Sequence, residues 1–371
     1  MLELADIVRE AGPAYRQAYG PRLLPSHRRA LRDIEACRTA ALGGHLRACD
    51  RCDRRQYAYH SCRNRHCPKC HADQTQRWLE RQRARLLPCP YFLATFTLPA
   101  ELRPLARSHQ KLVYGLLMRC AAEALLKLTA DPRHLGARPG LLAVLHTWTR
   151  AMAYHPHVHL LVTAGGLSRH DRTWVPARRP HFLAPGRALS LLFRAKLRDA
   201  LRHAGLAHHA PPEVWRKSWV VHLQHAGSGE KVLDYLARYV FRIALVNSRL
   251  ERFEKGQVTF RFRDGRTAKT KHCTLAAPTF IARFLQHVLP RGFSKVRHYG
   301  LFSPSHQPLL DTARAELLAS PATAPAPAPV VAKATAVTLH SDPAEHHTRC
   351  PFCGVGVMRI IDTLPRWRPP P

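Results

Sequence analysis

Hydrophobic positions recur along the chain with two different periods, and each period predicts its own elements. Spacings of three to four residues predict helices, at 14–19, 26–36, 74–87, 112–128, 189–203, 230–250 and 280–288. Runs rich in aromatic and β-branched residues predict strands, at 91–98, 141–148, 157–163, 215–224, 258–263 and 271–274. Residues 319–337 are rich in Ala and Pro and predict an extended linker.

The order of these elements leaves two sheet types open. Strands that alternate with long helices would suit a parallel sheet. However, only a short connection separates 141–148 from 157–163, and tight connections join antiparallel neighbours. We therefore expect an α+β fold in which an antiparallel sheet carries helices on one face.

The net charge of the chain indicates what kind of partner it binds. The chain has 58 Lys and Arg residues against 25 Asp and Glu, a formal net charge of +33. Arginine supplies most of the excess, and its planar guanidinium suits phosphate groups. DNA is therefore the expected partner, although an arginine-rich composition typical of a GC-rich genome is an alternative explanation.

Cysteine usage and the first residues bear on the compartment. The start, Met1–Asp6, lacks a basic and apolar signal peptide, and no apolar run has the length of a membrane span. These features predict a cytoplasmic protein with no membrane partner. Thiols stay reduced in the cytoplasm, so the 11 cysteines favour metal binding over disulfides.

A histidine run offers the first candidate metal site. His155, His157 and His159 occupy alternate positions of the strand predicted around 157–163. Alternate residues of a strand point to the same face, so three imidazoles would converge on one point. Polar histidines on the solvent face of a half-buried strand are the alternative interpretation.

A tyrosine pair offers candidate nucleophiles. Tyr235 and Tyr239 are one turn apart on the helix predicted at 230–250. The same helix carries Arg238 and Arg242, which we expect to contact DNA. A phenol attacks poorly without assistance, and a nearby metal ion that polarises a phosphate would supply it. Packing of both rings in a core is the alternative.

The cysteines predict a zinc module. Cys49 and Cys52 form one Cys-x-x-Cys pair, and Cys67 and Cys70 form a second, at a spacing typical of a four-cysteine zinc site. Cys37 and Cys62 lie in the same segment and leave a second zinc possible. Nearby basic residues predict DNA contacts, with Arg63, Arg65 and Lys69 as the candidates. The pair Cys350 and Cys353 has no obvious partner pair, so His346 or His347 would complete it.

Several motifs occur in the order found in one known family. They are the segment Cys62–Cys70, the segment Phe96–Pro99, the His-x-His strand, the Tyr-Leu-Ala-Arg-Tyr helix, and the segments Arg283–Phe293 and Arg297–Gly300. In this order the chain resembles the rolling-circle transposases of the insertion sequence ninety-one family, which are two-tyrosine enzymes of the HUH endonuclease superfamily. The resemblance extends from about His27 to Gly300.

The resemblance implies a fold, a site and a reaction. It implies an HUH antiparallel sheet in which His157 and His159 hold a catalytic Mg²⁺ or Mn²⁺, and His155 is our candidate third ligand, with His222 a lesser one. Tyr235 and Tyr239 would nick single-stranded DNA through a 5′-phosphotyrosine, both at the element ends and at a target site. The cysteines would bind structural zinc. No small-molecule substrate is implied.

Domain boundaries and rival functions complete the expectations. We expect a helical and zinc-binding DNA-recognition module at 1–88, a catalytic domain at 89–300, and a linker with a small Cys-x-x-Cys tail at 301–371. A plasmid relaxase or replication initiator would share the chemistry. A non-catalytic zinc-containing DNA-binding protein, or a nuclease that uses metal-bound water, are the more distant rivals.

Overall fold

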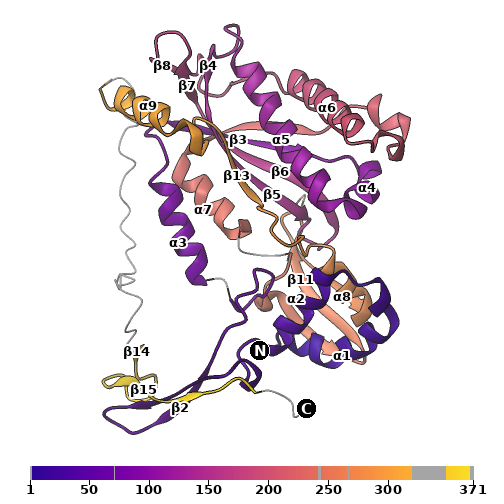
Figure 1. Ribbon diagram of the computed structural model, residues 1–371, viewed down its shortest axis with the longest axis vertical. Coiled ribbons are helices and arrows are strands. Elements are labelled where there is room, and N and C mark those ends of the chain that lie inside the picture. The colour runs from indigo at the N-terminus through magenta and orange to yellow at the C-terminus, as the bar shows by residue number, and fades with distance from the viewer. Residues whose placement is uncertain (1, 71, 241–243, 266, 320–347, 368–371) are drawn as a thin grey trace.

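A computed structural model shows how these elements assemble (Figure 1). The structure describes residues 2–70, 72–240, 244–265, 267–319 and 348–367, without the side chains of 72–74, 238, 239 and 348. Within these ranges, no helix has both the length and the apolar character needed to cross a bilayer.

A five-stranded antiparallel sheet forms the centre of the larger part of the molecule. Its strands lie in the order β13 (Val296–Gly300), β5 (Gly140–Trp148), β6 (Tyr154–Thr163), β3 (Pro90–Thr97) and β9 (Val221–Ser228). The expected hairpin between β5 and β6 is confirmed, and so is the α+β class. A small sheet, made of β4 (Ala137–Arg138), β7 (Gly165–Ser168) and β8 (Trp174–Pro176), extends one end.

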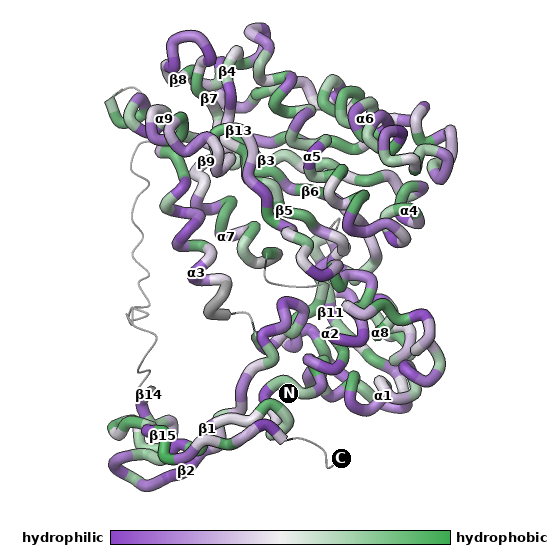
Figure 2. Tube along the Cα trace, in the orientation of Figure 1, coloured by the Kyte–Doolittle hydropathy of each residue, from purple (hydrophilic) through white to green (hydrophobic). Residues whose placement is uncertain are grey.

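Helices cover both faces of the central sheet, so the expectation of helices on one face is wrong. Side chains alternate along buried strands, and here both alternating sets are largely apolar, which creates two faces to cover. One face packs against α4 (Arg103–Ser108), α5 (Gln110–Thr129) and α6 (Gly186–His203). The other packs against α3 (Ala72–Arg83), α7 (Gly229–Val240) and α9 (Gln307–Ala319). Figure 2 shows the hydrophobic positions concentrated along the central strands.

A second core lies beside the central sheet. It joins the N-terminal helices α1 (Leu4–Tyr19) and α2 (Pro25–Ala36) to α8 (Ala277–Leu285) and to the sheet β10 (Leu250–Glu254), β11 (Gln257–Arg263) and β12 (Thr270–Ala276). Residues from the first 37 positions and residues from 244–288 therefore share one core, although the strands β3, β5, β6 and β9 lie between them in the sequence. The described part of α7 ends at Val240, well short of the predicted end of that helix near residue 250.

Segments from near the two ends of the chain meet in a fourth sheet. Its order is β14 (Thr348–Arg349), β15 (Val357–Leu364), β1 (Gly44–Cys49) and β2 (Arg55–Tyr59), with all pairs antiparallel. The C-terminal segment, expected as a separate small tail, is thus a strand partner of the N-terminal module (Figure 1). Most of the predicted linker, residues 320–337 of 319–337, lies outside the described residues.

One arginine of the cysteine segment fastens that segment to the loop that follows α8. The Arg65 guanidinium donates hydrogen bonds to the carbonyl oxygens of Phe293, at 2.6 Å, and Pro290, at 2.9 Å. Burial lowers the pKa of Arg65. This two-carbonyl contact replaces the DNA contact that we expected for Arg65, because its donors point into the protein.

Substitution of Arg65 should therefore destabilise the fold. Arg65→Met leaves two inward-facing carbonyls without their charged donor, and we expect a loss of about 2 kcal/mol in the free energy of unfolding. Arg63→Met is the matched control, because Arg63 is exposed and two residues away. Urea unfolding checks both; equal stability of the two variants would contradict the role given to Arg65.

Candidate active site

Three imidazoles from two neighbouring strands converge on one face of the central sheet. The antiparallel register places His146 of β5 opposite His157 of β6, and His159 follows two residues later on the same face. One ring nitrogen from each of these histidines lies within 4.8 Å of the other two. All three histidines are largely buried. This is a ligand set of the size that a catalytic metal site requires.

Hydrogen bonds orient two of these rings for a metal. His157 donates from Nδ1 to the carbonyl oxygen of His155 at 2.7 Å, and a carbonyl can only accept. Nδ1 therefore carries the proton, and the lone pair of His157 is on Nε2. Nδ1 of His159 lies 3.0 Å from the Thr95 hydroxyl, an oxygen that can accept the Nδ1 proton and so leave the lone pair of Nε2 for a metal. Contacts of this kind fix the rings of metal-bound histidines in other proteins.

Burial keeps these histidines neutral. It lowers the pKa of His157 to about 4 and that of His159 to about 3, and it lowers the pKa of His146 well below its ordinary value. The charges of neighbouring groups lower the pKa of His146 and His159 further. Neutral imidazole is the form that binds metals, so the residues fit a divalent cation at neutral pH.

His155 and His222 do not join this group. Arg103 donates a hydrogen bond of 2.8 Å to Nδ1 of His155, which uses the lone pair on that nitrogen. A neutral His155 then carries its proton on Nε2 and has no lone pair left for a metal. His222 is exposed on β9, outside the group. The third member of the cluster is therefore His146, in place of the expected His155.

Tyr235 lies against the histidines. It is carried by α7, which packs on the histidine face of the sheet, and its ring stands at 85° to the ring of His159 with 6.2 Å between centroids. The side chain remains 37% exposed, which leaves it accessible to a substrate. The other expected nucleophile, Tyr239, lies in the same helix, but its side chain is outside the described residues.

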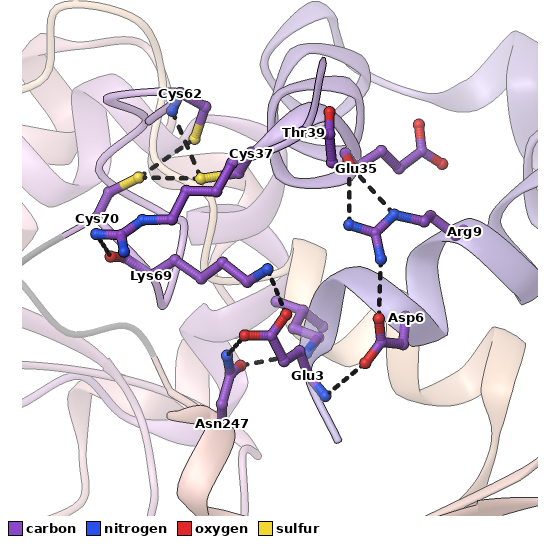
Figure 3. Close-up of polar contacts among 12 residues, drawn as sticks. Glu3, Asp6, Arg9, Glu35, Cys37, Thr39, Cys62, Lys69, Cys70 and Asn247 are labelled. Atoms are coloured by element: carbon purple, nitrogen blue, oxygen red, sulfur yellow. Dashed lines mark hydrogen bonds and ion pairs between the residues drawn. The ribbon is translucent and has the colours of Figure 1, made fainter. Parts of the chain in front are cut away.

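The cysteines of the zinc module form a different grouping from the one expected. Cys67 and Cys70 lie with Cys37 and Cys62, and the four sulfurs are within 4.8 Å of one another. Cys37 Sγ is 3.3 Å from Cys70 Sγ, which in turn is 3.5 Å from Cys62 Sγ (Figure 3). The expected site of Cys49, Cys52, Cys67 and Cys70 is thus corrected, because the first pair lies in another cluster, with Cys350 and Cys353.

Of the basic residues expected to contact DNA, one keeps an exposed position among those described. Arg63 is exposed, whereas Lys69 forms an ion pair with Glu3 of α1 and retains a side-chain exposure of 16% (Figure 3). Lys69 thus has an internal partner in place of a phosphate. Arg242 and the side chain of Arg238 lie outside the described residues.

Two family models match the chain. The first, described as "Transposase zinc-binding domain", matches residues 7–98, which contain the cluster of Cys37, Cys62, Cys67 and Cys70. The second, described as "Putative transposase", matches residues 140–308, which contain the three histidines and Tyr235. No solved structure matches the chain.

Curated relatives cover nearly the same length. "Putative transposase y4qJ" of Sinorhizobium fredii (strain NBRC 101917 / NGR234) is 40% identical over 100% of this chain and 97% of its own length. "Transposase for insertion sequence element IS801" of Pseudomonas savastanoi pv. phaseolicola is 30% identical over 87% of this chain and 83% of its own. The chain belongs to the insertion sequence ninety-one family of transposases. The expected family and the zinc-binding N-terminal module are therefore confirmed.

The sequence of this transposase did contain a signal for the residue that was missed. His146 lies on the strand predicted at 141–148, directly before the short connection to the histidine strand. Counting back across an antiparallel hairpin places a residue near 146 opposite 157. His146 is therefore a better candidate ligand than His155, whose carbonyl oxygen accepts a hydrogen bond from His157 and whose ring accepts one from Arg103.

Metal binding should separate the two candidate third ligands. His146→Ala removes one of three convergent imidazoles, so we expect its affinity for Mn²⁺ to fall by at least about 100-fold, beyond the loss typical of an outer-shell partner. His155→Ala should stay near the wild-type affinity. Calorimetric titration of the zinc-loaded protein measures both. Loss of binding in His155→Ala together with retention in His146→Ala would contradict the assignment.

The buried histidines also predict a pH dependence of stability. Burial lowers the pKa of His157 and of His287 to about 4 from an ordinary 6.5, so the unfolded chain takes up protons in a range where the folded chain does not. The free energy of unfolding should therefore decrease as the pH falls from 6.5 toward 4. Urea unfolding at pH 7, 6 and 5, without divalent cations, measures it.

A matched pair of variants tests whether buried histidines cause this pH dependence of the free energy of unfolding. His287→Gln should flatten the curve, whereas His170→Gln should leave it unchanged because His170 is exposed. An equal free energy of unfolding at pH 7 and pH 5 in the wild type would rule out the contribution of the buried rings.

Proposed function

We propose that this transposase cuts and rejoins single-stranded DNA at the ends of its insertion sequence, with Tyr235 or Tyr239 as the attacking group. The position of Tyr235 carries the proposal. Its ring contacts that of His159, at the edge of the histidine cluster, while over a third of the side chain stays open to solvent. A tyrosine that only packed in the core would be buried.

His146, His157 and His159 would hold the catalytic metal. Imidazole nitrogens combined with phosphate oxygens suit Mg²⁺ or Mn²⁺, and three protein ligands leave positions for the substrate. When bound there, a divalent cation polarises the scissile phosphate and offsets the charge that develops during attack. The neutral, oriented rings of His157 and His159 support this assignment.

The tyrosine oxygen attacks the phosphorus of the scissile phosphodiester. The phenol loses its proton as the new bond forms, the bond from phosphorus to the 3′ oxygen breaks, and the leaving 3′ oxygen takes up a proton in exchange. The products are a 5′-phosphotyrosine, which preserves the energy of the broken bond, and a free 3′-hydroxyl, which can prime replication. A second tyrosine one turn away on α7 would accept the next strand, as rolling-circle transposition by an HUH-type enzyme requires.

DNA is the partner that the charge favours. The net charge of +33 attracts a polyanion, and exposed Arg63 of the zinc module remains a candidate phosphate contact. We also propose Arg238 and Arg242 as DNA contacts, because they lie next to the two tyrosines in the sequence. A relaxase or replication initiator would use the same chemistry, and membership in the transposase family favours transposition over either role.

A covalent adduct tests this proposal. The wild-type protein, incubated with Mn²⁺ and a single-stranded oligonucleotide that carries the element end, should form a complex that survives denaturation. A 3′ label should stay with the protein and a 5′ label should be released, because the linkage is to the 5′ phosphate. Tyr235→Phe with Tyr239→Phe should abolish the adduct, whereas Tyr19→Phe, an exposed tyrosine on α1, should retain it.

Cleavage without an adduct would identify a different enzyme. A nuclease that uses metal-bound water would still cut the oligonucleotide in the doubly substituted protein. That result would overturn the assignment of the tyrosines and leave them as packing residues.

A further inference from the structure

A second group of four cysteines draws on both ends of the chain. Cys49 ends β1 and Cys52 lies in the turn between β1 and β2, whereas Cys350 and Cys353 lie in the turn between β14 and β15. Their sulfurs are within 4.8 Å of one another, with 3.7 Å between Cys49 and Cys353 and 3.7 Å between Cys52 and Cys350. Four thiolates around one tetrahedral zinc are about 3.8 Å apart, so the spacing fits that ion.

The backbone around these sulfurs fits thiolates. The amides of Arg51, Phe352 and Gly356 donate to the sulfurs of Cys49, Cys350 and Cys353, at 3.4, 3.4 and 3.3 Å. Amides that point at sulfur stabilise its negative charge and orient the ligand. A Cβ on Gly356 would lie 2.4 Å from Cys49 Sγ, so only glycine allows the two turns to approach this closely.

Other contacts hold the same two segments in register. Asp50 accepts a hydrogen bond of 2.8 Å from the amide of Val357 and forms an ion pair of 3.4 Å with Arg359. The Arg54 guanidinium lies 5.8 Å from the centre of the Phe352 ring. The contact between the ends is thus specific on both sides of the cysteines.

We propose that this group binds a second zinc ion, which fastens the C-terminal segment to the N-terminal module and thereby completes a groove for the backbone of single-stranded DNA. The choice of DNA as occupant rests on the proposed function. The zinc ion itself does not, because the four sulfurs and their amides specify it independently.

The groove lies on the sheet that the two ends share. It encloses about 480 Å³ and is lined by residues of both ends, namely Arg38, Arg47, Gln56, Tyr57, Ala58 and Tyr59 of the first and Arg349, Pro351 and Met358 of the second. Three of these residues are arginines and, of the described residues that line the groove, none is acidic. Arginine forks match phosphate geometry, so a nucleic-acid backbone is the occupant that the charge favours.

The dependence on zinc follows from the place of Arg349. This exposed residue directly precedes Cys350, and its strand β14 pairs only with β15 among the described strands. Release of the ion would free the turn that carries Arg349 from the turn of Cys49. The groove would then lose Arg349, one of its three arginines, together with Pro351, while Met358 would stay paired through β15 and β1.

Metal content tests the site directly in the full-length protein. Mass spectrometry of metals should find two zinc ions per chain in the wild type and one in Cys350→Ser with Cys353→Ser. Cys273→Ser is the matched control and should keep two, because Cys273 lies on β12 outside both groups. One zinc in the wild type would overturn the proposal.

A measurement on the unmodified chain covers the case in which that variant does not fold. Titration of the metal-free wild type with Co²⁺ should raise the thiolate charge-transfer absorption up to two equivalents. Saturation at one equivalent would contradict a second site.

DNA binding tests the groove, without Mg²⁺ or Mn²⁺ so that cleavage plays no part. Arg349→Gln should keep two zinc ions but weaken binding of the element-end oligonucleotide, and the slope of log Kobs against log salt should fall by about 0.7, the value for one lost single-strand phosphate contact. Arg133→Gln, an exposed arginine paired with Asp131, should bind like the wild type. Wild-type binding by Arg349→Gln would exclude the groove, whatever the outcome for the tyrosines.

Discussion

The pairing register of β5 and β6 is the constraint on which the candidate active site depends. It sets His146 opposite His157 and leaves His159 on the same face two residues further on. The same strand provides the carbonyl of His155 that orients the ring of His157, and the neighbouring strand β3 provides Thr95 beside His159. A slip of one residue would turn these rings to the opposite face of the sheet, which the apolar packing of α5 and α6 covers. The candidate metal site is therefore built from strands of the sheet, and no loop residue contributes one of its three histidines.

The zinc module connects to this site through one helix. Cys70, a member of the first cysteine cluster, lies two positions before α3 in the sequence, and α3 packs along α7, the helix that carries Tyr235. An ion pair of 2.9 Å between Arg83 and Asp234 joins the two helices next to that tyrosine. The structure thus relates the position of the zinc module to the position of the candidate nucleophile. An enzyme that must recognise an element end and cut it at a defined distance needs such a relation.

Much of the fold can be predicted from the periodicity of the sequence alone. The elements that cannot be predicted in this way have one physical cause in common. Strands β3, β5 and β6 and helices α5 and α6 lie within a few residues of their predicted bounds, because each is long and largely buried. Strands β13 and β15 are mostly half-buried or exposed, and they take their structure from the strands they pair with. Their pairing is a tertiary effect that local pattern does not contain.

The candidate site shows the same division. His157, His159 and the tyrosine helix are readable from local spacing, whereas the third ligand depends on which side chains already have partners. Arg103 uses the lone pair of His155, and no motif places that arginine beside the histidine. The cysteines were misgrouped for a related reason. Cys49 and Cys52 find the second pair of their cluster about 300 residues away, at the other end of the chain, where sequence spacing carries no information.

Binding of one divalent cation by His146, His157 and His159, beside Tyr235, is the central proposal. Crystals of the protein soaked in Mn²⁺, measured for anomalous scattering near the manganese edge, would locate that ion. We predict a single strong peak on the histidine face of the sheet, within bonding distance of these three rings, while His155 keeps its hydrogen bond to Arg103. A peak coordinated by His155 without His146, or no peak between β5 and β6, would contradict it.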